Sequence, residues 1–399
     1  MTLQTKSPVA GFLAGTIGWT LDAFDFFLVV FCLTAIGREF HEPDSTVSLS
    51  IVATLSCRPI GGFLFGLLAD RYGRRMPMIL NLVLCAVVQA LSGLAPSFVL
   101  FLVSRALFGI LMGGQWGVGA SMAMEKVPAK YRGLLSGVLQ QGYALGYLLA
   151  AVAYYFLFEK VGWRPLFYLA SLPALLAAAY VAIFVEESEV WKKTRHETWA
   201  GLRTALLSNW KLFLYMTGFA LTMHMVAHGS QDMYPTFLER QWHFKAPQRA
   251  QLTALSMLGA IVGGTLGGFL SDHVGRRRSI VIALIGAMFA IPLWAFAPSL
   301  PLLMLGAILI QFCIQGAWGV VPAQLTELSP DSVRGFLPGF GNACGVVLSS
   351  GVVYIETLIA GRTSYGVAMA STAAIVLLCA IVVTSLGPEK RATEFGAGN

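Results

Sequence analysis

The stretch GLLADRYGRR at residues 66–75 returns 202 residues later as GFLSDHVGRR at residues 268–277. The same offset relates three further pairs of segments: Ala-Pro-Ser at 95–97 and 297–299, Trp-Gly at 116–117 and 318–319, and Glu-x-x-Pro-x-x-x-Arg-Gly at 125–133 and 327–335. One register kept across so many positions indicates an internal duplication. The chain is therefore predicted to consist of two equivalent halves.

The composition places both halves in a membrane. Hydrophobic residues make up 56% of the 399 residues and charged residues only 12%, whereas soluble domains average about 25% charged residues. The charges cluster between apolar runs of about 20 residues, the length that an α-helix needs to cross a bilayer. This pattern excludes a soluble enzyme, and it excludes an outer-membrane barrel, whose strands alternate every second residue.

Twelve apolar runs predict an all-α membrane protein with twelve transmembrane helices, arranged as two parallel six-helix repeats. We expect the first bundle over residues 1–185, a cytoplasmic linker over 186–209 and the second bundle over 210–399. The runs cover residues 10–37, 48–69, 77–94, 99–123, 133–158, 165–185, 210–238, 251–271, 279–296, 300–323, 336–358 and 364–386.

The basic residues predict the orientation. With both termini in the cytoplasm, 18 of the 27 Lys and Arg residues fall in cytoplasmic loops and tails, 7 fall outside and 2 lie within apolar runs. This asymmetry follows the positive-inside rule. The net charge of +7 therefore reflects topology and contact with membrane lipids rather than nucleic-acid binding. We expect a multi-pass protein of the plasma membrane, in bacteria the inner membrane.

Parallel six-helix repeats that hold a substrate at their interface are the plan of alternating-access transporters. The repeated motifs at 66–75 and 268–277, with those at 125–133 and 327–335, resemble the major facilitator superfamily, and the match spans nearly the whole chain. The resemblance implies the major facilitator fold, rocker-switch transport and a monomer. Nothing in the sequence indicates ATP use.

The repeated charges predict a gate at the cytoplasmic face. We expect two ion-pair clusters that hold this face closed: Asp70, Arg74, Glu125 and Arg132 in the first half, and Asp272, Arg276, Glu327 and Arg334 in the second. Exposed pairs contribute only about 0–1 kcal/mol each, so such a gate must act cooperatively. The alternative is that these basic residues only set the topology and bind anionic headgroups.

Few charges lie inside the apolar runs, and such residues are functional candidates because a charge at the bilayer centre is costly. Asp22 and Asp25 lie in the first run, Arg58 in the second and Arg105 in the fourth. Arg58 is the predicted substrate contact, since a guanidinium binds a carboxylate through two parallel hydrogen bonds. The alternative is a permanent ion pair between Arg58 and Asp25. For Arg105 we favour a supporting role in helix packing.

The seventh run carries a polar stripe of His224, His228 and Asp232 at spacing i, i+4, i+8. The segment from His224, with the residues after Trp19, resembles the lactate and pyruvate permeases of fungi and, more loosely, bacterial sialic acid permeases. The residues that match the fungal pattern are His228, Ser230, Gln231, Asp232 and Thr236, whereas His224 stands in place of Asn and Ala227 in place of Ser or Thr. The resemblance implies proton and carboxylate chemistry. The alternative is that the histidines only pack.

Uncharged polar residues at the same depth are candidate contacts for a hydroxyl or keto oxygen. They are Gln115, Gln140, Gln141, Tyr143, Gln231, Gln311, Gln315 and Asn342. Amides serve equally well as hydrogen-bonding links between helices, so both roles stay open.

These features predict a proton-coupled symporter of short monocarboxylates such as lactate or pyruvate. An anion that enters against 100 mV faces about 2.3 kcal/mol, and a proton carried with it cancels this cost. The proton carrier is predicted among His228 with Asp232, His224, and the competing acids Asp22 and Asp25, because imidazole titrates near neutrality. The alternatives are a symporter of larger organic acids, such as sialate or aromatic acids, and a non-transporting sensor. We expect no catalytic residues, no metal site and no cofactor other than the coupling proton.

Overall fold

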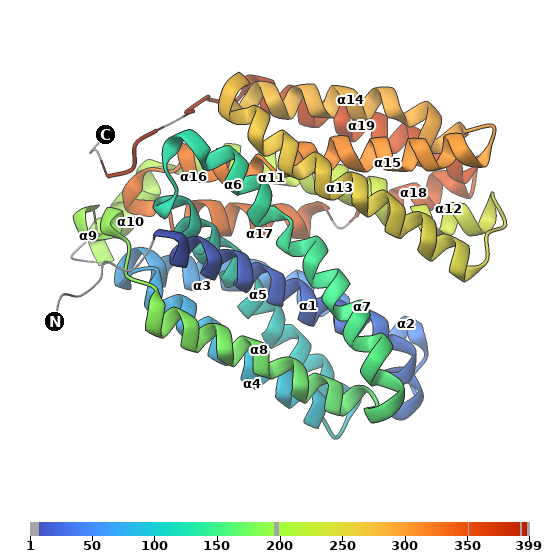
Figure 1. Cartoon of the computed structure of the whole chain (residues 1–399), viewed down its shortest axis with the longest axis horizontal. Helices are drawn as coiled ribbons and strands as arrows, with labels where there is room; N and C mark the ends of the chain where they lie inside the picture. Colours follow the sequence, from blue (N-terminus) through green and yellow to red (C-terminus); the bar gives the residue numbers. More distant parts are fainter. Residues whose placement is uncertain (1–7, 195–198, 350, 392, 397–399) are drawn as a thin grey trace.

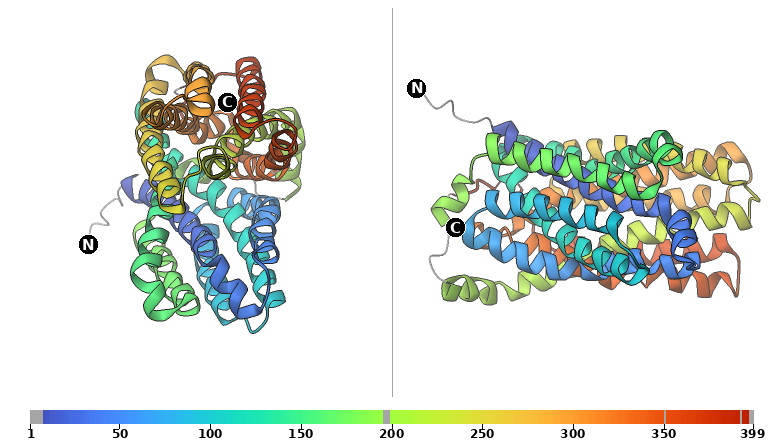
Figure 2. Two further views of the ribbon diagram at one scale, coloured as in Figure 1. Left: turned by 90° about the vertical axis from the view of Figure 1, so that its right-hand side faces the viewer. Right: turned by 90° about the horizontal axis from the view of Figure 1, so that it is seen from below.

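The computed structural model describes residues 8–194, 199–349, 351–391 and 393–396. Within these ranges every regular element is a helix (Figure 1). The long helices run along one common direction (Figure 2, right). This arrangement matches the predicted fold class.

The helices of the first half are α1 (Pro8–Phe40), α2 (Asp44–Val47), α3 (Leu49–Tyr72), α4 (Arg75–Leu94), α5 (Phe98–Lys126), the short turn η1 (Ala129–Tyr131), α6 (Arg132–Gln140), α7 (Gly142–Val161) and α8 (Trp163–Phe184). The linker forms α9 (Glu189–Thr194) and α10 (Trp199–Ser208). The second half contains α11 (Trp210–Gln231), α12 (Tyr234–Arg240), α13 (Ala246–Val274), α14 (Arg276–Phe296), α15 (Leu300–Trp318), α16 (Val321–Leu328), η2 (Asp331–Val333), α17 (Leu337–Ser349), α18 (Val352–Ala360) and α19 (Tyr365–Leu386).

Eleven helical spans among the described residues are long and apolar enough to cross a membrane. The remaining predicted segment corresponds to α11, which has 22 residues and is therefore about 33 Å long. Its two histidines lower its hydropathy. Four predicted runs are not continuous helices, because the chain breaks between α6 and α7, α11 and α12, α15 and α16, and α17 and α18. Glycine or proline stands at each restart, at Gly142, Pro235, Pro322 and Gly351.

Glycines bring the helices of each half into close contact. A Cβ on Gly113 of α5 would lie 1.9 Å from the carbonyl oxygen of Arg58 on α3. In the second half, a Cβ on Gly263 of α13 would lie 2.0 Å from the carbonyl oxygen of Phe312 on α15. Only a residue without a side chain permits this approach. The packing fixes α3 against α5 and therefore fixes the position of Arg58.

The two halves form two bundles that meet most closely at one end and diverge toward the other (Figure 1). α17 packs against α3 and α5, and α13 packs against α6. A Cβ on Gly117 of α5 would lie 2.5 Å from the Cα of Gly339 on α17. The start of α1 and the linker helices α9 and α10 lie at this closed end, which is the end predicted to be cytoplasmic (Figure 1).

Candidate functional site

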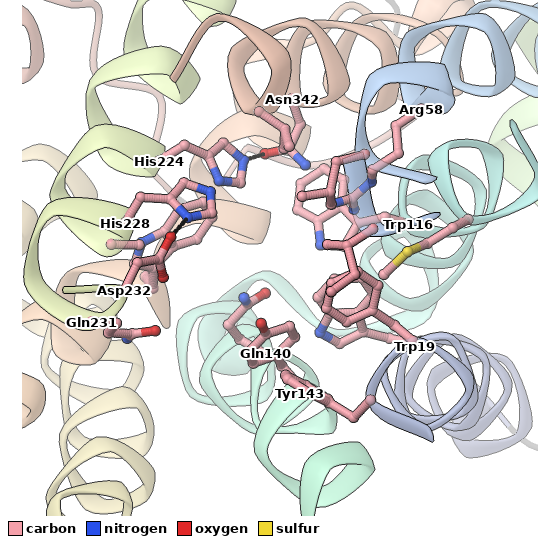
Figure 3. A pocket seen from close by; sticks show the side chains of 18 of the residues that line it. Trp19, Arg58, Trp116, Gln140, Tyr143, His224, His228, Gln231, Asp232 and Asn342 are labelled. Atoms are coloured by element: carbon pink, nitrogen blue, oxygen red, sulfur yellow. Dashed lines mark hydrogen bonds and ion pairs between the residues drawn. The ribbon is translucent and has the colours of Figure 1, made fainter. Parts of the chain in front are cut away.

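A cavity of about 310 Å³ lies between the two bundles (Figure 3). Helices of the first half contribute Trp19, Phe26, Phe27, Val30, Ile51, Leu55, Arg58, Met112, Trp116, Gln140 and Tyr143. The second half contributes His224, Ala227, His228, Gln231, Asp232, Gln315, Trp318, Asn342 and Val346. Charged and polar groups therefore meet aromatic rings at the interface between the repeats.

Arg58 lies on the wall opposite His228 and Asp232 (Figure 3). Its side chain is 6% exposed, and its Nε has no hydrogen-bond partner. No carboxylate of the described residues lies within ion-pair distance of it, although Asp22 and Tyr143 interact with it electrostatically. A buried guanidinium without a paired acid is costly, so the arrangement leaves a place for an anion.

Asp22 and Asp25 are both buried in α1, and neither lines the cavity. Asp22 interacts electrostatically with Arg58, whereas Asp25 interacts with Arg105 of α5. The predicted alternative, a pair between Asp25 and Arg58, is therefore wrong. The reason is helix geometry, because residues three apart point about 60° away from each other and meet different neighbours. Arg105 also donates from Nη1 to Gln89 Oε1 at 2.9 Å, which supports its packing role.

The polar stripe of α11 faces the cavity. His228 Nδ1 and Asp232 Oδ2 are 2.9 Å apart, so the predicted contact between these residues is present. Their side chains are 26% and 42% exposed, respectively, which leaves the pair open to water. His224 Nε2 lies 3.1 Å from Asn342 Oδ1, and its ring centroid lies 4.7 Å from that of Trp318.

The predicted amides divide into two groups. Gln231, Gln315 and Asn342 line the cavity, together with Gln140. Gln231 Nε2 donates to Gln311 Oε1 at 2.9 Å, so Gln311 supports a lining residue from behind.

Three predicted substrate residues lie outside the cavity lining. Besides Gln311, these are Gln115, which packs against Gly18 of α1, and Gln141, which packs against Gly264 of α13. Gln115 and Gln141 do not line the cavity, because both point into helix contacts formed by glycine, and Gln311 lies behind Gln231. The depth of a residue in the membrane can be estimated from its position in an apolar run. The sequence does not show whether its side chain faces the cavity or a neighbouring helix.

Tyr143 lines the cavity as predicted, whereas the other aromatic side chains of the cavity wall were not among the predicted site residues. Trp19 stacks on Tyr143 with ring centroids 5.9 Å apart, and Trp116 and Trp318 contribute further surface. The sequence repeat could have indicated Trp116 and Trp318, because these residues are related by the 202-residue offset. Gln140 and Asn342 are related by the same offset, and both line the cavity.

The predicted gate residues form two buried clusters at the closed end. Arg74 pairs with Asp70 at 2.8 Å and with Glu125 at 3.1 Å, and Arg276 pairs with Asp272 at 2.7 Å and with Glu327 at 2.8 Å. Burial opposes the charge of Arg74, but Glu125 and Asp70 outweigh it and raise the pKa of Arg74 above its ordinary value.

The second arginine of each cluster contacts an acid of the other half. Arg132 pairs with Glu327 of the other half at 3.0 Å, and Arg334 approaches Glu125 of the other half at 3.9 Å. Both guanidinium groups also lie over the ring of Phe395, at 3.7 Å from its centroid. The predicted placement of Arg132 in the cluster of its own half is wrong, because the segment that begins α6 packs against the opposite bundle. Arg334 also pairs with Asp331 of its own half, so it contacts acids of both halves.

The acids of the gate also cross between halves. Asp70 accepts from the amides of Gly335 and Phe336 at 2.7 and 3.0 Å. Asp272 accepts from the amides of Gly133 and Leu134 at 2.8 Å each. Each carboxylate therefore binds unpaired amides at the start of a helix in the opposite bundle.

Two further acids support the gate and were missed in the sequence. Glu187 accepts from the amides of Arg74 and Arg75 at 2.7 and 3.1 Å, at the start of α4. Glu389 accepts from the amides of Arg276 and Arg277 at 2.7 and 3.0 Å, at the start of α14. These glutamates are again 202 residues apart, so the repeat could have revealed them.

Comparison with known proteins agrees with this architecture. The family model described as Major Facilitator Superfamily matches residues 15–241 and 233–397. A carboxylic acid transporter protein homolog of Saccharomyces cerevisiae is 26% identical over 88% of this chain, and the chain spans 61% of that protein's length. The sialic acid transporter NanX of Escherichia coli is 25% identical over 88% of this chain and 87% of its own.

Solved structures share the fold. The structure of the proton:xylose symporter XylE superposes with a TM-score of 0.78 at 17% identity, and the match covers 99% of this chain and 98% of the other. With its many apolar helices and its transporter relatives, the protein is a multi-pass protein of the plasma membrane. The chain belongs to the major facilitator superfamily.

Proposed function

We propose that the protein is a proton-coupled symporter of an organic acid anion, with short monocarboxylates such as lactate or pyruvate as the leading substrate class. The observation that carries the proposal is Arg58. Its guanidinium is buried in the cavity wall without an acid in ion-pair distance among the described residues, and it faces the His228–Asp232 pair across the cavity. A carboxylate supplies the missing charge.

The proton would bind at the His228–Asp232 pair. The two side chains share a hydrogen bond and remain partly exposed, so a proton can reach them from the water-filled side of the cavity. Protonation removes negative charge from the wall opposite Arg58 and admits the anion. The loaded cavity is then nearly neutral, which lowers the cost of moving the site across the membrane.

Arg58 is the one arginine among the described residues that line the cavity, which supports one carboxylate per substrate. The names of the relatives, which include carboxylic acid and sialic acid transporters, support the same class of substrate. The buried gate clusters support alternating access, because they close one end of the interface while the cavity lies beyond them.

A second candidate substrate class is a larger organic acid. The cavity volume of about 310 Å³ and the rings of Trp19, Trp116 and Trp318 leave room for a bulkier, planar acid as well as for a three-carbon acid. Aromatic rings stack on one another with a gain of about 0.5–1.5 kcal/mol beyond their area burial.

The test is uptake and counterflow in proteoliposomes that hold the purified full chain. Labelled pyruvate is the probe, with lactate, sialate and benzoate as competitors, and each assay is run with and without an imposed pH difference. We expect accumulation that requires the inside to be more alkaline. Uptake that ignores the gradient contradicts symport, and competition by sialate or benzoate alone assigns the larger substrate class.

A further inference from the structure

A buried acid lies beside the cavity, and no feature of the sequence singled it out. Glu356 on α18 is 0% exposed. Neither of its carboxyl oxygens has a hydrogen-bond partner among the residues that the structure describes. Buried polar groups almost always have partners, so an acid with none requires an explanation.

The carboxyl group occupies the junction of α11, α18 and α19. A Cβ on Gly229 of α11 would lie 3.5 Å from Glu356 Oε1 and 3.9 Å from Thr372 Cγ2 on α19. The hydroxyl of Thr372 is likewise buried and without a partner. Gly229 directly follows His228 in α11. Glu356 therefore lies against the face of α11 that adjoins the face carrying the proposed proton site.

The described groups around Glu356 include no cation that pairs with its carboxyl group. α19 carries no charged side chain, and α11 carries Lys211 in its first turn and His224, His228 and Asp232 near its C-terminal end. Of these, Asp232 interacts electrostatically with Glu356, and its charge is of the same sign. A carboxylate buried without a partner is costly, and binding a proton removes this cost.

We propose that Glu356 is a second proton-binding site that exchanges its proton with the His228–Asp232 pair. In this step the O–H bond of protonated Asp232 breaks, an O–H bond forms on the Glu356 carboxylate, and the negative charge moves to the half-exposed Asp232. No other reactant is needed. The inference rests on the proposed proton coupling, and it adds the group that stores the proton away from water.

The location links the stored proton to gating. α12 and α18 follow breaks in their transmembrane segments and lie at the end where the bundles diverge (Figure 1). A charged Glu356 requires water in the junction, whereas a protonated Glu356 permits α18 to pack against α11 and α19 as observed. The junction of α11, α18 and α19 therefore stays free of water only while Glu356 carries a proton.

The test compares Glu356→Gln with wild type in proteoliposomes, with pyruvate and benzoate as probes. The amide imitates the protonated acid but cannot release a proton. We expect counterflow at equal pH to continue, while accumulation driven by one pH unit, about 10-fold in wild type, falls to equilibrium in the variant. The matched control is Glu159→Gln, a change at the exposed end of α7 that should leave both assays unchanged.

Each outcome decides between the two proposals. If wild type does not respond to the gradient, the proposed function fails. If wild type and Glu356→Gln accumulate the probe equally, proton coupling stands and the assignment of Glu356 is overturned. Infrared difference spectra of wild type against Glu356→Gln provide a direct readout, because a protonated acid adds a carboxylic C=O band that the variant lacks.

Folding of the variants is part of the same test. A site that holds a neutral acid accepts a neutral side chain, so Glu356→Gln and Glu356→Met should both reach the membrane folded. Failure of both would show that the negative charge is required in the folded state, and the proposal would be overturned.

Discussion

Arg132 of the first half lies 3.0 Å from Glu327 of the second, and both side chains are nearly fully buried. Glu327 also forms an ion pair with Arg276 of its own half at 2.8 Å. The same carboxylate therefore links a contact within one bundle to a contact between bundles. Opening this end must expose Arg132 and Glu327 together, so the gate acts as one unit rather than as separate surface pairs.

Glu327→Gln should weaken the closed end. Removal of one partner from a buried ion pair costs about 3–5 kcal/mol, because the other charge stays buried without compensation. We expect a lower melting temperature and faster hydrogen exchange at the amides of Gly133 and Leu134, which lie in the same cluster. The control is Glu239→Gln, which removes an exposed pair with Arg249 that is worth at most about 1 kcal/mol. Equal effects of the two variants would contradict a buried gate.

Gly73→Ala should destabilise the protein more than Gly162→Ala. Both glycines have extended backbone at positive φ, with φ 99° and 78°, a region that costs other residues about 1–3 kcal/mol. A Cβ on Gly73 would also lie 2.1 Å from Glu187 Oε2 and displace the acid that caps α4, whereas Gly162 has no neighbour within 4 Å. Loss of such a cap costs about 1 kcal/mol more.

Melting temperatures of the two alanine variants provide the measurement. Combining Gly73→Ala with Glu187→Ala should cost less than the sum of the single changes, because the cap can be lost only once. Equal melting temperatures for the two glycine variants would show that Glu187 does not stabilise the start of α4.

The sequence predicts the architecture well because its signals are periodic and repeated. The length of the apolar runs and the 202-residue register set the helices and the two halves, and the same register leads to Trp116, Trp318, Glu187 and Glu389 once it is followed further. What it does not predict are contacts that depend on the direction of a side chain. Gln115 and Gln141 have the predicted depth but face glycine contacts.

Contacts between the halves are the second kind of feature that sequence reasoning did not supply. Arg132 and Glu125 belong to one motif, and their proximity in sequence favoured a pair within one half. The packing of α6 against α13 instead turns Arg132 toward Glu327. Glu356 was missed for a different reason, since a single acid near the end of an apolar run resembles a loop residue until its burial is known.

Arg58→Gln should abolish tight anion binding. Hydrogen bonds to a charged group contribute about 1.5–3 kcal/mol, so we expect an affinity about 10- to 100-fold weaker. Arg58→Lys keeps the charge but loses the planar fork, and it should give an intermediate affinity. Quenching of the fluorescence of the cavity tryptophans by pyruvate or benzoate measures the change, and Arg164→Lys on α8, outside the cavity, is the control. Wild-type affinity in Arg58→Gln would refute the assignment.

His228→Gln should separate substrate exchange from proton-driven accumulation. If the His228–Asp232 pair takes the proton that admits the anion, proton and pyruvate bind together, so wild-type affinity for pyruvate falls as the pH rises. The glutamine cannot titrate, so the variant should bind pyruvate with little pH dependence, retain counterflow and lose gradient-driven uptake. Binding measured across pH 5–8, together with uptake under an imposed gradient, tests both parts.

Asp25→Asn is the informative comparison, because Asp25 is buried against Arg105 and lies outside the cavity lining. Loss of gradient-driven uptake in His228→Gln but not in Asp25→Asn assigns the proton to α11. The reverse result assigns it to α1, since a buried acid that faces an arginine can also exchange a proton when the helices move. Loss of gradient-driven uptake in both variants means that the proton binds in both halves of the protein. Coupling then depends on the relative motion of the halves rather than on one residue.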